Sequence, residues 1–192
     1  MSKLPDFRPS IRTFLAVGLV AVAAARTPLA VCSAQDSAKS TTNTQLAPID
    51  TYFVMQTSLG TPFQVDSGRL AKNEGGTQAI RSYAELMVGS HIEVDQVLET
   101  ILKHKNPVPP PTLLKAAYTT MIATLKTEKG ETFDADYVRG QVNYQKANAR
   151  LYQYEIDNGA DPDLKAFAQQ TLPKIQDHLE RALKLEQELK VR

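Results

Sequence analysis

The 192-residue chain has no tryptophan, one cysteine and three histidines. One cysteine cannot form an internal disulfide, so the fold has to be stabilised by burial of apolar side chains. The sequence also lacks CxxC pairs, glycine-rich phosphate loops and a GxSxG motif, which removes common signatures of redox, nucleotide and hydrolase chemistry. Basic and acidic residues number 22 and 21, so there is no charge excess of the kind that nucleic-acid binding needs. These absences predict an apolar-cored protein with no nucleic-acid partner and no catalytic motif.

The N-terminus of the chain carries the pattern of an export signal. Lys3, Arg8 and Arg12 precede an apolar run over residues 13–25 that is too short to span a bilayer comfortably. Small residues then offer a site for signal peptidase, and we expect cleavage after Ala34. The pattern therefore predicts an exported, periplasmic protein.

A second interpretation of the same segment involves the single cysteine. The run Leu29-Ala30-Val31-Cys32 is similar to the motif at which bacterial lipoproteins are cut and lipidated, although Val31 is bulkier than the residue usually found there. A lipid on Cys32 would attach the protein to the outer membrane, and it is the only membrane contact that we expect. Residues 1–34, the expected signal peptide, carry four cations and one acid, so their removal changes the formal net charge from +1 to −2.

Beyond the signal, composition divides the chain into two parts. Residues 35–49 are rich in Ser, Thr, Ala and Gln without an apolar period, which predicts a disordered spacer. Residues 50–192 are sufficient for one continuous core, and their apolar side chains recur at the three- and four-residue spacing of helices. In the longest such segment, residues 77–105, this stripe includes His91. The pattern predicts an all-α domain.

Glycine and proline mark the expected helix ends. A first short helix is expected to stop at Gly60 and to restart at Pro62, and a kink or restart is expected at Pro173. The expected helices cover residues 51–58, 62–73, 77–105, 113–127, 134–158 and 161 to the charged C-terminal end. No segment shows a strand pattern. We therefore predict an antiparallel four-helix bundle with a short extra helix between the second and third long helices.

Several short runs carry a family resemblance. They are Tyr52-Phe53-Val54, Gly68-Arg69-Leu70-Ala71, Phe133-Asp134 with Tyr137-Val138 and Gln141-Val142, and above all residues 161–179. Over residues 51–185 the chain resembles the exported bacterial family catalogued as domain of unknown function 4142. That resemblance implies a ferritin-like bundle behind a signal peptide, in the periplasm or at the outer membrane. Its motifs are helix-packing patterns, so they imply a fold and little about activity.

The resemblance also implies positions for metal-binding side chains. Members of the family tend to carry a Glu in the first long helix, an Asp-His pair in the second, and one His in each of the third and fourth. At the matching positions this chain has Gln64, Ser90-His91, Tyr144 or Gln145, and Asp177-His178. Two of the expected ligands are thus replaced, which weakens any metal role.

The residues themselves leave two interpretations of this layer. A di-iron site needs Glu-x-x-His on two helices, and the chain has no such motif. Asp66, His91 and His178, with Gln145, could still meet across the bundle and bind a divalent metal such as iron or zinc. Alternatively, Asp66, His91 and Gln145 form hydrogen bonds with one another and make a purely structural polar layer. His104 lies between two lysines at a helix end and is expected in solvent.

These observations favour a non-catalytic envelope protein that binds a partner protein or a small ligand and carries no cofactor. Tyrosines crowd the helix expected over residues 134–158 and can line a groove for such a ligand. They are Tyr137, Tyr144, Tyr152 and Tyr154. The alternative function is a metal-binding ferritin-like bundle that stores ions or performs redox chemistry at Asp66, His91 and His178. Stoichiometric bound metal distinguishes the two functions.

Overall fold

The computed structural model describes residues 44–107 and 112–190. Within them the chain is all-α, with five helices and one pair of two-residue strands. The helices are α1 (Pro48–Glu74), α2 (Gln78–Leu102), α3 (Thr112–Thr127), α4 (Gly130–Asn158) and α5 (Pro162–Lys190). The expected signal peptide and the possible lipid site at Cys32 lie outside the described residues. No helix of the described part is long and apolar enough to cross a membrane.

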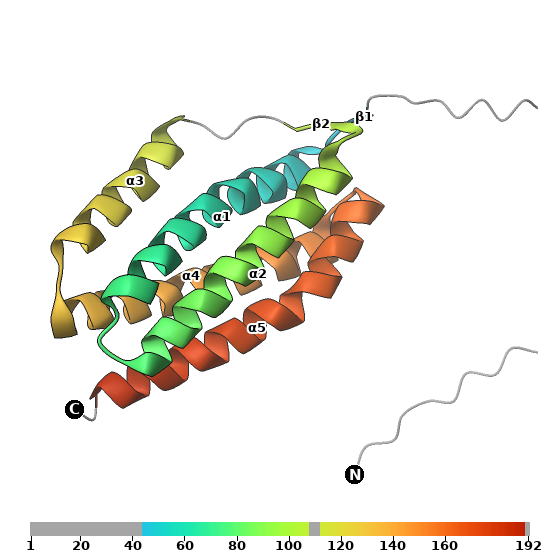
Figure 1. Cartoon of the computed structure of the whole chain (residues 1–192). Coiled ribbons are helices and arrows are strands. Elements are labelled where there is room, and N and C mark those ends of the chain that lie inside the picture. Colours follow the sequence, from blue (N-terminus) through green and yellow to red (C-terminus); the bar gives the residue numbers. More distant parts are fainter. Residues whose placement is uncertain (1–43, 108–111, 191–192) are drawn as a thin grey trace, which may run out of the picture. The chain divides into compact units, whose positions relative to one another are not determined.

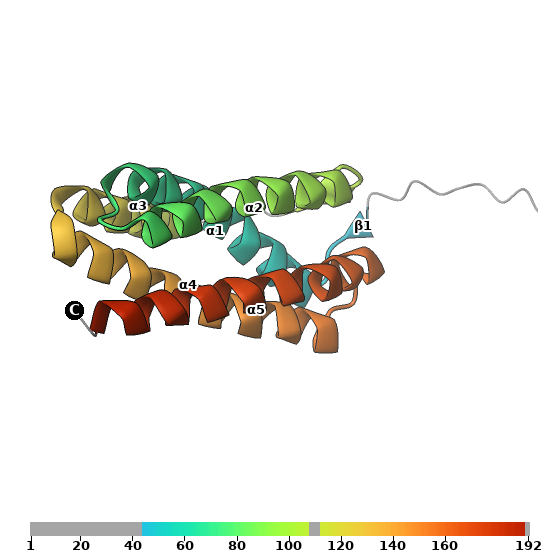
Figure 2. The same cartoon turned by 60° about the horizontal axis from the view of Figure 1, so that its bottom comes forward.

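The four long helices form two antiparallel hairpins, which Figure 2 shows as two layers. α1 pairs with α2 across the turn at Gly75 and Gly76, and α4 pairs with α5 across the turn at residues 159–161. The hairpins pack with α1 on α4 and α2 on α5. Between α2 and α4 the chain returns along the bundle, so these two helices run in the same direction (Figure 1). α3 is part of this return and lies beside α1, with a smaller contact to α4.

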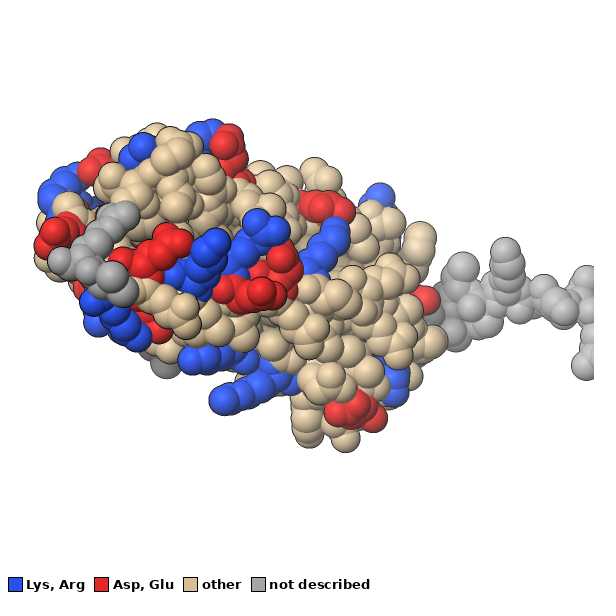
Figure 3. Space-filling view, turned by 90° about the horizontal axis from the view of Figure 1, so that it is seen from below, with Lys and Arg blue, Asp and Glu red and all other residues tan. Residues whose placement is uncertain are grey.

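Charged side chains of both signs lie on the outside of the bundle. On the face seen in Figure 3, basic and acidic residues alternate in a band. Ion pairs within α5 and between α5 and α2 include Lys174 with Glu93 at 2.9 Å and Arg181 with Asp177 at 2.7 Å. All four side chains are about half exposed or more, so each pair contributes little to stability. This face is a mixed-charge surface, which agrees with the near balance of charges in the sequence.

Two short strands, one before α1 and one after α2, pair in parallel. β1 (Thr44–Gln45) pairs with β2 (Lys105–Asn106). This pair could not be predicted from the sequence, because two residues are too few to show an alternating pattern. β1 lies inside residues 35–49, the expected disordered spacer, and α1 begins before the expected boundary at residue 50. The fold therefore extends further toward the N-terminus than composition predicts.

α1 corrects the expectation of two short helices. It runs without interruption through Gly60 and Pro62. Pro62 is exposed, so water can hydrogen-bond to the carbonyl of Ser58 that lacks its usual amide donor. Gly60 is buried, and a Cβ atom there would collide with the hydroxyl group of Tyr144 on α4. The glycine therefore makes room for a neighbouring helix and does not end its own.

Two further residues that commonly break helices also need their surroundings to be understood. The helix restart offered as one outcome at Pro173 does not occur, since α5 passes through this exposed proline as one helix. Gly159 follows α4 with φ −56°, which is not the left-handed conformation that glycine often adopts after a helix. A Cβ atom at Gly159 would collide with the carboxyl group of Glu155, so close packing accounts for this glycine. Among the described glycines the left-handed one is Gly130, with φ +57°, at the start of α4.

The buried apolar side chains form two clusters. The first cluster lies toward the α1–α2 turn and the second toward the α4–α5 turn. The first includes Ala71, Met87, Val142 and Ala182, and the second includes Val54, Leu98, Tyr152 and Ile175. Along each long helix, a buried polar residue falls between its members of the two clusters. The interior of the bundle is thus divided at mid-length by a polar layer.

Candidate functional site

The polar layer receives one buried side chain from each long helix. These are Gln64 of α1, His91 of α2, Gln145 of α4 and His178 of α5. The two glutamines are 0% exposed and the two histidines are each 5% exposed. Helical spacing turns the imidazoles inward, because His91 follows buried Met87 by four residues and His178 precedes buried Ala182 by four.

The two imidazoles lie next to each other. Their ring centroids are 6.3 Å apart. Ser90 Oγ lies 3.3 Å from His178 Nε2, within hydrogen-bonding distance. The hydroxyl of Tyr83 donates to the backbone carbonyl of His178 at 3.2 Å, which ties α5 to α2 at this level. Neither His91 Nε2 nor His178 Nδ1 has a hydrogen-bond partner among the described residues.

Burial keeps both histidines neutral. It lowers the pKa of His91 to about 3, and the neighbouring charge of His178 acts in the same direction. It lowers the pKa of His178 to about 4, where Asp177 opposes the shift and Arg181 and Lys174 add to it. A neutral imidazole has one nitrogen with a free lone pair. At neutral pH the layer therefore offers two lone pairs and carries no histidine charge.

The glutamines of the layer are incompletely hydrogen-bonded. Gln145 Nε2 donates to Met87 Sδ at 3.5 Å, whereas Gln145 Oε1 has no partner in the described structure. Neither amide atom of Gln64 has a partner there. A buried polar atom left unpaired costs about 1–3 kcal/mol. The protein alone thus leaves the layer less stable than an apolar interior would be.

Replacing Gln145 by leucine is therefore expected to leave the thermal unfolding temperature unchanged or to raise it, by about 2–4 °C for each kcal/mol gained. Leucine has a similar volume and leaves no polar atom unpaired. Circular dichroism during heating measures the change, and Gln153→Leu, at an exposed position of the same helix, is the matched control. A large decrease confined to Gln145→Leu would contradict the expectation and indicate that a bound molecule pairs with the amide.

Asp66 does not join the layer, which corrects the expected metal set. Its side chain is 60% exposed and lies 3.9 Å from Arg69. Asp66 follows Gln64 by two residues, and the resulting rotation of about 200° places it on the other side of α1. Phe63 lies three residues before Asp66 on the same side of α1; it faces α3 and stacks on Tyr118 with ring centroids 4.9 Å apart. The structure brings the two histidines together without the carboxylate.

The donors in the layer do not fit a di-iron centre. Such a centre needs several carboxylates aimed inward, whereas the layer offers two imidazoles and two carboxamides. Across residues 44–107 and 112–190, no three His, Cys, Asp or Glu side chains are placed to hold a metal ion together. The third histidine, His104, is exposed just beyond the end of α2, as expected.

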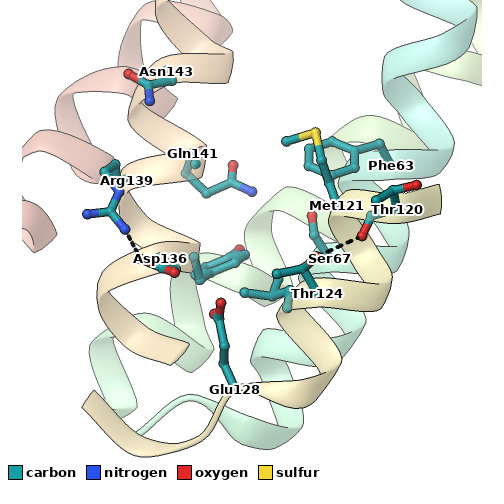
Figure 4. Close-up of a pocket in the computed structure, with 13 residues that line it drawn as sticks. Phe63, Ser67, Thr120, Met121, Thr124, Glu128, Asp136, Arg139, Gln141 and Asn143 are labelled. Atoms are coloured by element: carbon teal, nitrogen blue, oxygen red, sulfur yellow. Dashed lines mark hydrogen bonds and ion pairs between the residues drawn. The ribbon is translucent and has the colours of Figure 1, made fainter. Parts of the chain in front are cut away.

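A cavity of about 320 Å³ lies between α1, α3 and α4 (Figure 4). Phe63, Met121 and Leu125 form much of its apolar wall. Three of its lining residues each carry a buried polar atom that has no hydrogen-bond partner in the described structure: Glu128 Oε2, the Tyr137 hydroxyl and Gln141 Oε1. In Figure 4, Gln141 points from α4 toward Phe63 and Met121, and Glu128 points in from the connection between α3 and α4. The cavity has the size and the mixed lining of a small-molecule site.

α3 covers this cavity loosely. Of the α3 side chains that the structure describes, Ile122 is buried, Tyr118 and Leu125 are partly buried, and Met121 is 50% exposed. A further hollow of about 500 Å³ lies between α3 and α1. The sequence could not reveal the cavity, because the period of residues 113–127 predicts an apolar helical face but not what that face covers. A signal was present in the composition, since α3 has two lysines, no acid and a large apolar share, which is unusual for an exposed helix.

A pair of buried acids lies at the α4–α5 end of the bundle. Glu155 is 1% exposed, and neither of its carboxyl oxygens has a hydrogen-bond partner in the described part. Asp50 of α1 accepts hydrogen bonds from the backbone amides of Ala160 at 2.9 Å and Asp161 at 3.1 Å. Burial raises the pKa of Glu155 to about 7, with Asp50 and Asp161 acting in the same direction and Lys165 opposing. Glu155 is therefore a carboxyl group that titrates near neutral pH.

Ionisation of Glu155 is expected to lower stability as the pH rises. Its ordinary pKa is 4.5 and its folded pKa is about 7, so between these values the folded protein binds more protons than the unfolded chain. The stabilisation that protonated Glu155 contributes is complete below the unfolded pKa of 4.5 and is lost as the pH rises through the folded pKa of about 7. Urea unfolding at about pH 6 and about pH 8 should show that Glu155→Gln gains stability over the natural protein at the higher pH. Glu131→Gln, at an exposed position of α4, should give a pH-independent difference; equal pH slopes for all three proteins would contradict the assignment.

The helices, their packing and the polar layer define an all-α helical-bundle protein. The chain belongs to the family described as Domain of unknown function (DUF4142), which matches residues 35–185. The resemblance that the helix-packing motifs carry over residues 51–185 is thereby confirmed. A comparison with curated proteins gives no match.

Among solved structures, the crystal structure of a DUF305 fragment from Deinococcus radiodurans is similar to this chain. The TM-score is 0.65, and the alignment covers 78% of this chain and 100% of that one. The two sequences are 17% identical over it. The likeness at this identity concerns the fold and carries no information on activity.

Proposed function

We propose that the protein is an exported, non-catalytic helical bundle that binds a small ligand in the cavity between α1, α3 and α4. The supporting observation is the group of three unpaired buried atoms on Glu128, Tyr137 and Gln141. Buried polar atoms in proteins are nearly always paired, so three unpaired ones on residues that line one cavity support a molecule that pairs with them. These groups can form hydrogen bonds but do not combine a nucleophile with a base, which supports binding over catalysis.

Two observations support export as part of this proposal. The N-terminal pattern of basic residues, apolar run and small residues is that of a signal peptide. The family match begins at residue 35, directly after the expected cleavage position at Ala34. Mass spectrometry of the mature N-terminus separates a chain that begins at Gln35 from one that is lipidated at Cys32. A full-length chain retained inside the cell would contradict export.

A ferritin-like arrangement of the four long helices is also proposed. Bundles of that class have one long crossover between the second and third long helices. In this chain α2 and α4 run in the same direction, and α3 lies in the segment that connects them (Figure 1). This topology leaves α3 outside the four-helix interior, where it borders the proposed ligand cavity.

A matched pair of glycine substitutions tests ligand binding. Gly140 lines the cavity, and a Cβ atom there meets nothing within 4 Å. Gly89 of α2 is equally open but does not line the cavity. Phenylalanine at either position replaces a helical glycine, so both variants are expected to fold.

The probe for this test is 2-phenylethanol, a neutral aromatic alcohol that suits apolar walls with hydrogen-bonding groups. NMR titration is expected to show saturable binding, with shifts in α3 and α4, for the natural protein and for Gly89→Phe. Binding should be lost in Gly140→Phe because the ring occupies the cavity. The proposal fails if the natural protein binds neither this probe nor charged probes with the same phenyl body, or if Gly140→Phe binds the probe as well as Gly89→Phe does.

Metal binding by His91 and His178 is the second candidate function. Its supporting observation is that His91 Nε2 and His178 Nδ1 are unpaired in neutral rings whose centroids are 6.3 Å apart. Zinc and iron bind neutral imidazole with bonds of about 2.0–2.1 Å, and the amide oxygens of Gln64 and Gln145 are the remaining donors in the layer. Untagged, exported protein should be analysed for metal beside His91→Ala, His178→Ala and the control His104→Ala. Stoichiometric metal that is lost in the first two variants alone would support this function, and a metal-free natural protein would exclude it.

A further inference from the structure

We infer that the ligand of the cavity between α1, α3 and α4 is a small organic ammonium, an apolar or aromatic group that carries a protonated amine. This inference rests on the proposed function and specifies the chemistry of that same site. It follows from the kind of polar atom that lines the cavity, from the charge of the lining and from its apolar walls.

The unpaired atoms call for a ligand that donates hydrogen bonds. Gln141 Oε1 and Glu128 Oε2 can only accept, and the hydroxyl oxygen of Tyr137 can accept as well. Burial raises the pKa of Tyr137 well above its ordinary value, so this hydroxyl stays neutral. A protonated primary amine has three N–H donors and no acceptor. Its donor count equals the number of unpaired acceptor atoms on these three lining residues.

The charge of the lining favours a cation. Four charged or chargeable side chains contribute to it, and two of them, Asp136 and Arg139, form an ion pair with each other. Tyr137 is neutral, which leaves the carboxylate of Glu128 as the charge that no lining residue balances. Glu128 forms no ion pair within the described residues. An ammonium group supplies the missing positive charge, whereas a carboxylate or phosphate ligand would add to the negative charge.

The apolar walls set the size of the remainder of the ligand. Phe63 and Met121 face the cavity in Figure 4, and Leu125 also lines it. A volume of about 320 Å³ lies at the lower end of the range for small-molecule sites, so it suits one ring or a short chain. An aromatic wall also attracts a cation through its ring face. A phenylalkyl ammonium has both properties.

Three probes with the same phenyl body and different polar ends test the inference. They are 2-phenylethylammonium, 2-phenylethanol and phenylacetate, titrated into the full mature protein by isothermal calorimetry. Charge-assisted hydrogen bonds exceed neutral ones by enough to predict that the ammonium binds about tenfold more tightly than the alcohol. Phenylacetate is expected to bind most weakly.

Two variants assign the preference to Glu128. Glu128→Gln keeps the shape of the side chain and should reduce ammonium binding to the level of the alcohol, while Glu131→Gln, an exposed acid nearby in sequence, should keep the preference. Equal binding of ammonium and alcohol by the natural protein, or a preference that survives Glu128→Gln, would overturn the inference but not the proposed function. If none of the three probes binds, the proposed function fails as well. The comparison within the natural protein decides the matter even if Glu128→Gln does not fold.

Discussion

In a Glu155→Gln background, lowering the pH from about 7 to about 4 is expected to reduce the free energy of unfolding by several kcal/mol. The cause is the pair of buried imidazoles. Unfolded histidine has a pKa of 6.5, whereas the folded pKa is about 3 for His91 and about 4 for His178. Between these values the unfolded chain binds more protons than the folded one. Stability therefore falls as the pH falls through this window and is unaffected above it.

Glu155 has to be replaced in this experiment because it acts with the opposite sign over part of the same range. Urea unfolding at a series of pH values measures the slope in the Glu155→Gln protein and in two further variants on that background. Leucine at both His91 and His178 should flatten the acid side of the profile, whereas leucine at exposed His104 should leave it as steep as before. An unchanged slope in the double variant would show that protonation of the layer does not control acid unfolding.

Phe53→Ala is expected to reduce the free energy of unfolding by about 3–5 kcal/mol. Phe53 is 1% exposed and belongs to the second apolar cluster. Its ring meets the edge of Tyr152 at a centroid distance of 4.9 Å and that of Phe167 at 6.1 Å, so α1 is joined through it to both α4 and α5. Alanine removes these contacts and leaves a cavity that rigid helices cannot close.

The neighbouring Tyr52 supplies the control for this substitution. It is 50% exposed and precedes Phe53 on the same turn of α1. Tyr52→Ala is expected to change the free energy of unfolding by no more than about 0.5 kcal/mol, as is usual for surface positions. Denaturant unfolding of both variants, followed by circular dichroism, measures the difference. Similar losses for the two substitutions would mean that the ring contacts of Phe53 are not the main link between the hairpins.

The positions of the long helices were largely predictable from sequence, because each buries a stripe that repeats at helical spacing. The effect of glycine and proline on the helices was harder to predict. Gly60 and Pro62 together look like a helix end, yet Gly60 faces Tyr144 of α4 and Pro62 faces water within a continuous helix. Whether a glycine or proline ends a helix depends on what lies against it, and the chain order does not contain that information. The predicted ends at Gly75-Gly76 and after Asn158 held because real turns occur there.

The candidate sites show the same division. His91 could be placed in the interior from the sequence, because it continues a clear apolar stripe. Asp66 was misplaced because the stripe through Phe63 buries against α3, so the phase of α1 cannot be read from apolar residues alone. The cavity could not be predicted, because Glu128 lies in the connection between α3 and α4 while Tyr137 and Gln141 lie on α4. How closely α4 approaches α3 depends on the tertiary structure.

The two apolar clusters have a consequence for how the molecule opens. Each draws side chains from both hairpins, so neither hairpin keeps a complete core if the other departs, and the long helices should unfold as one cooperative unit. α3 contributes only the partly buried Leu125 to the edge of one cluster among its described side chains. Its amide hydrogens should therefore exchange with solvent through a local detachment that leaves the four long helices intact. The proposed ligand cavity therefore borders the helix of the described part that can move without disturbing either apolar cluster.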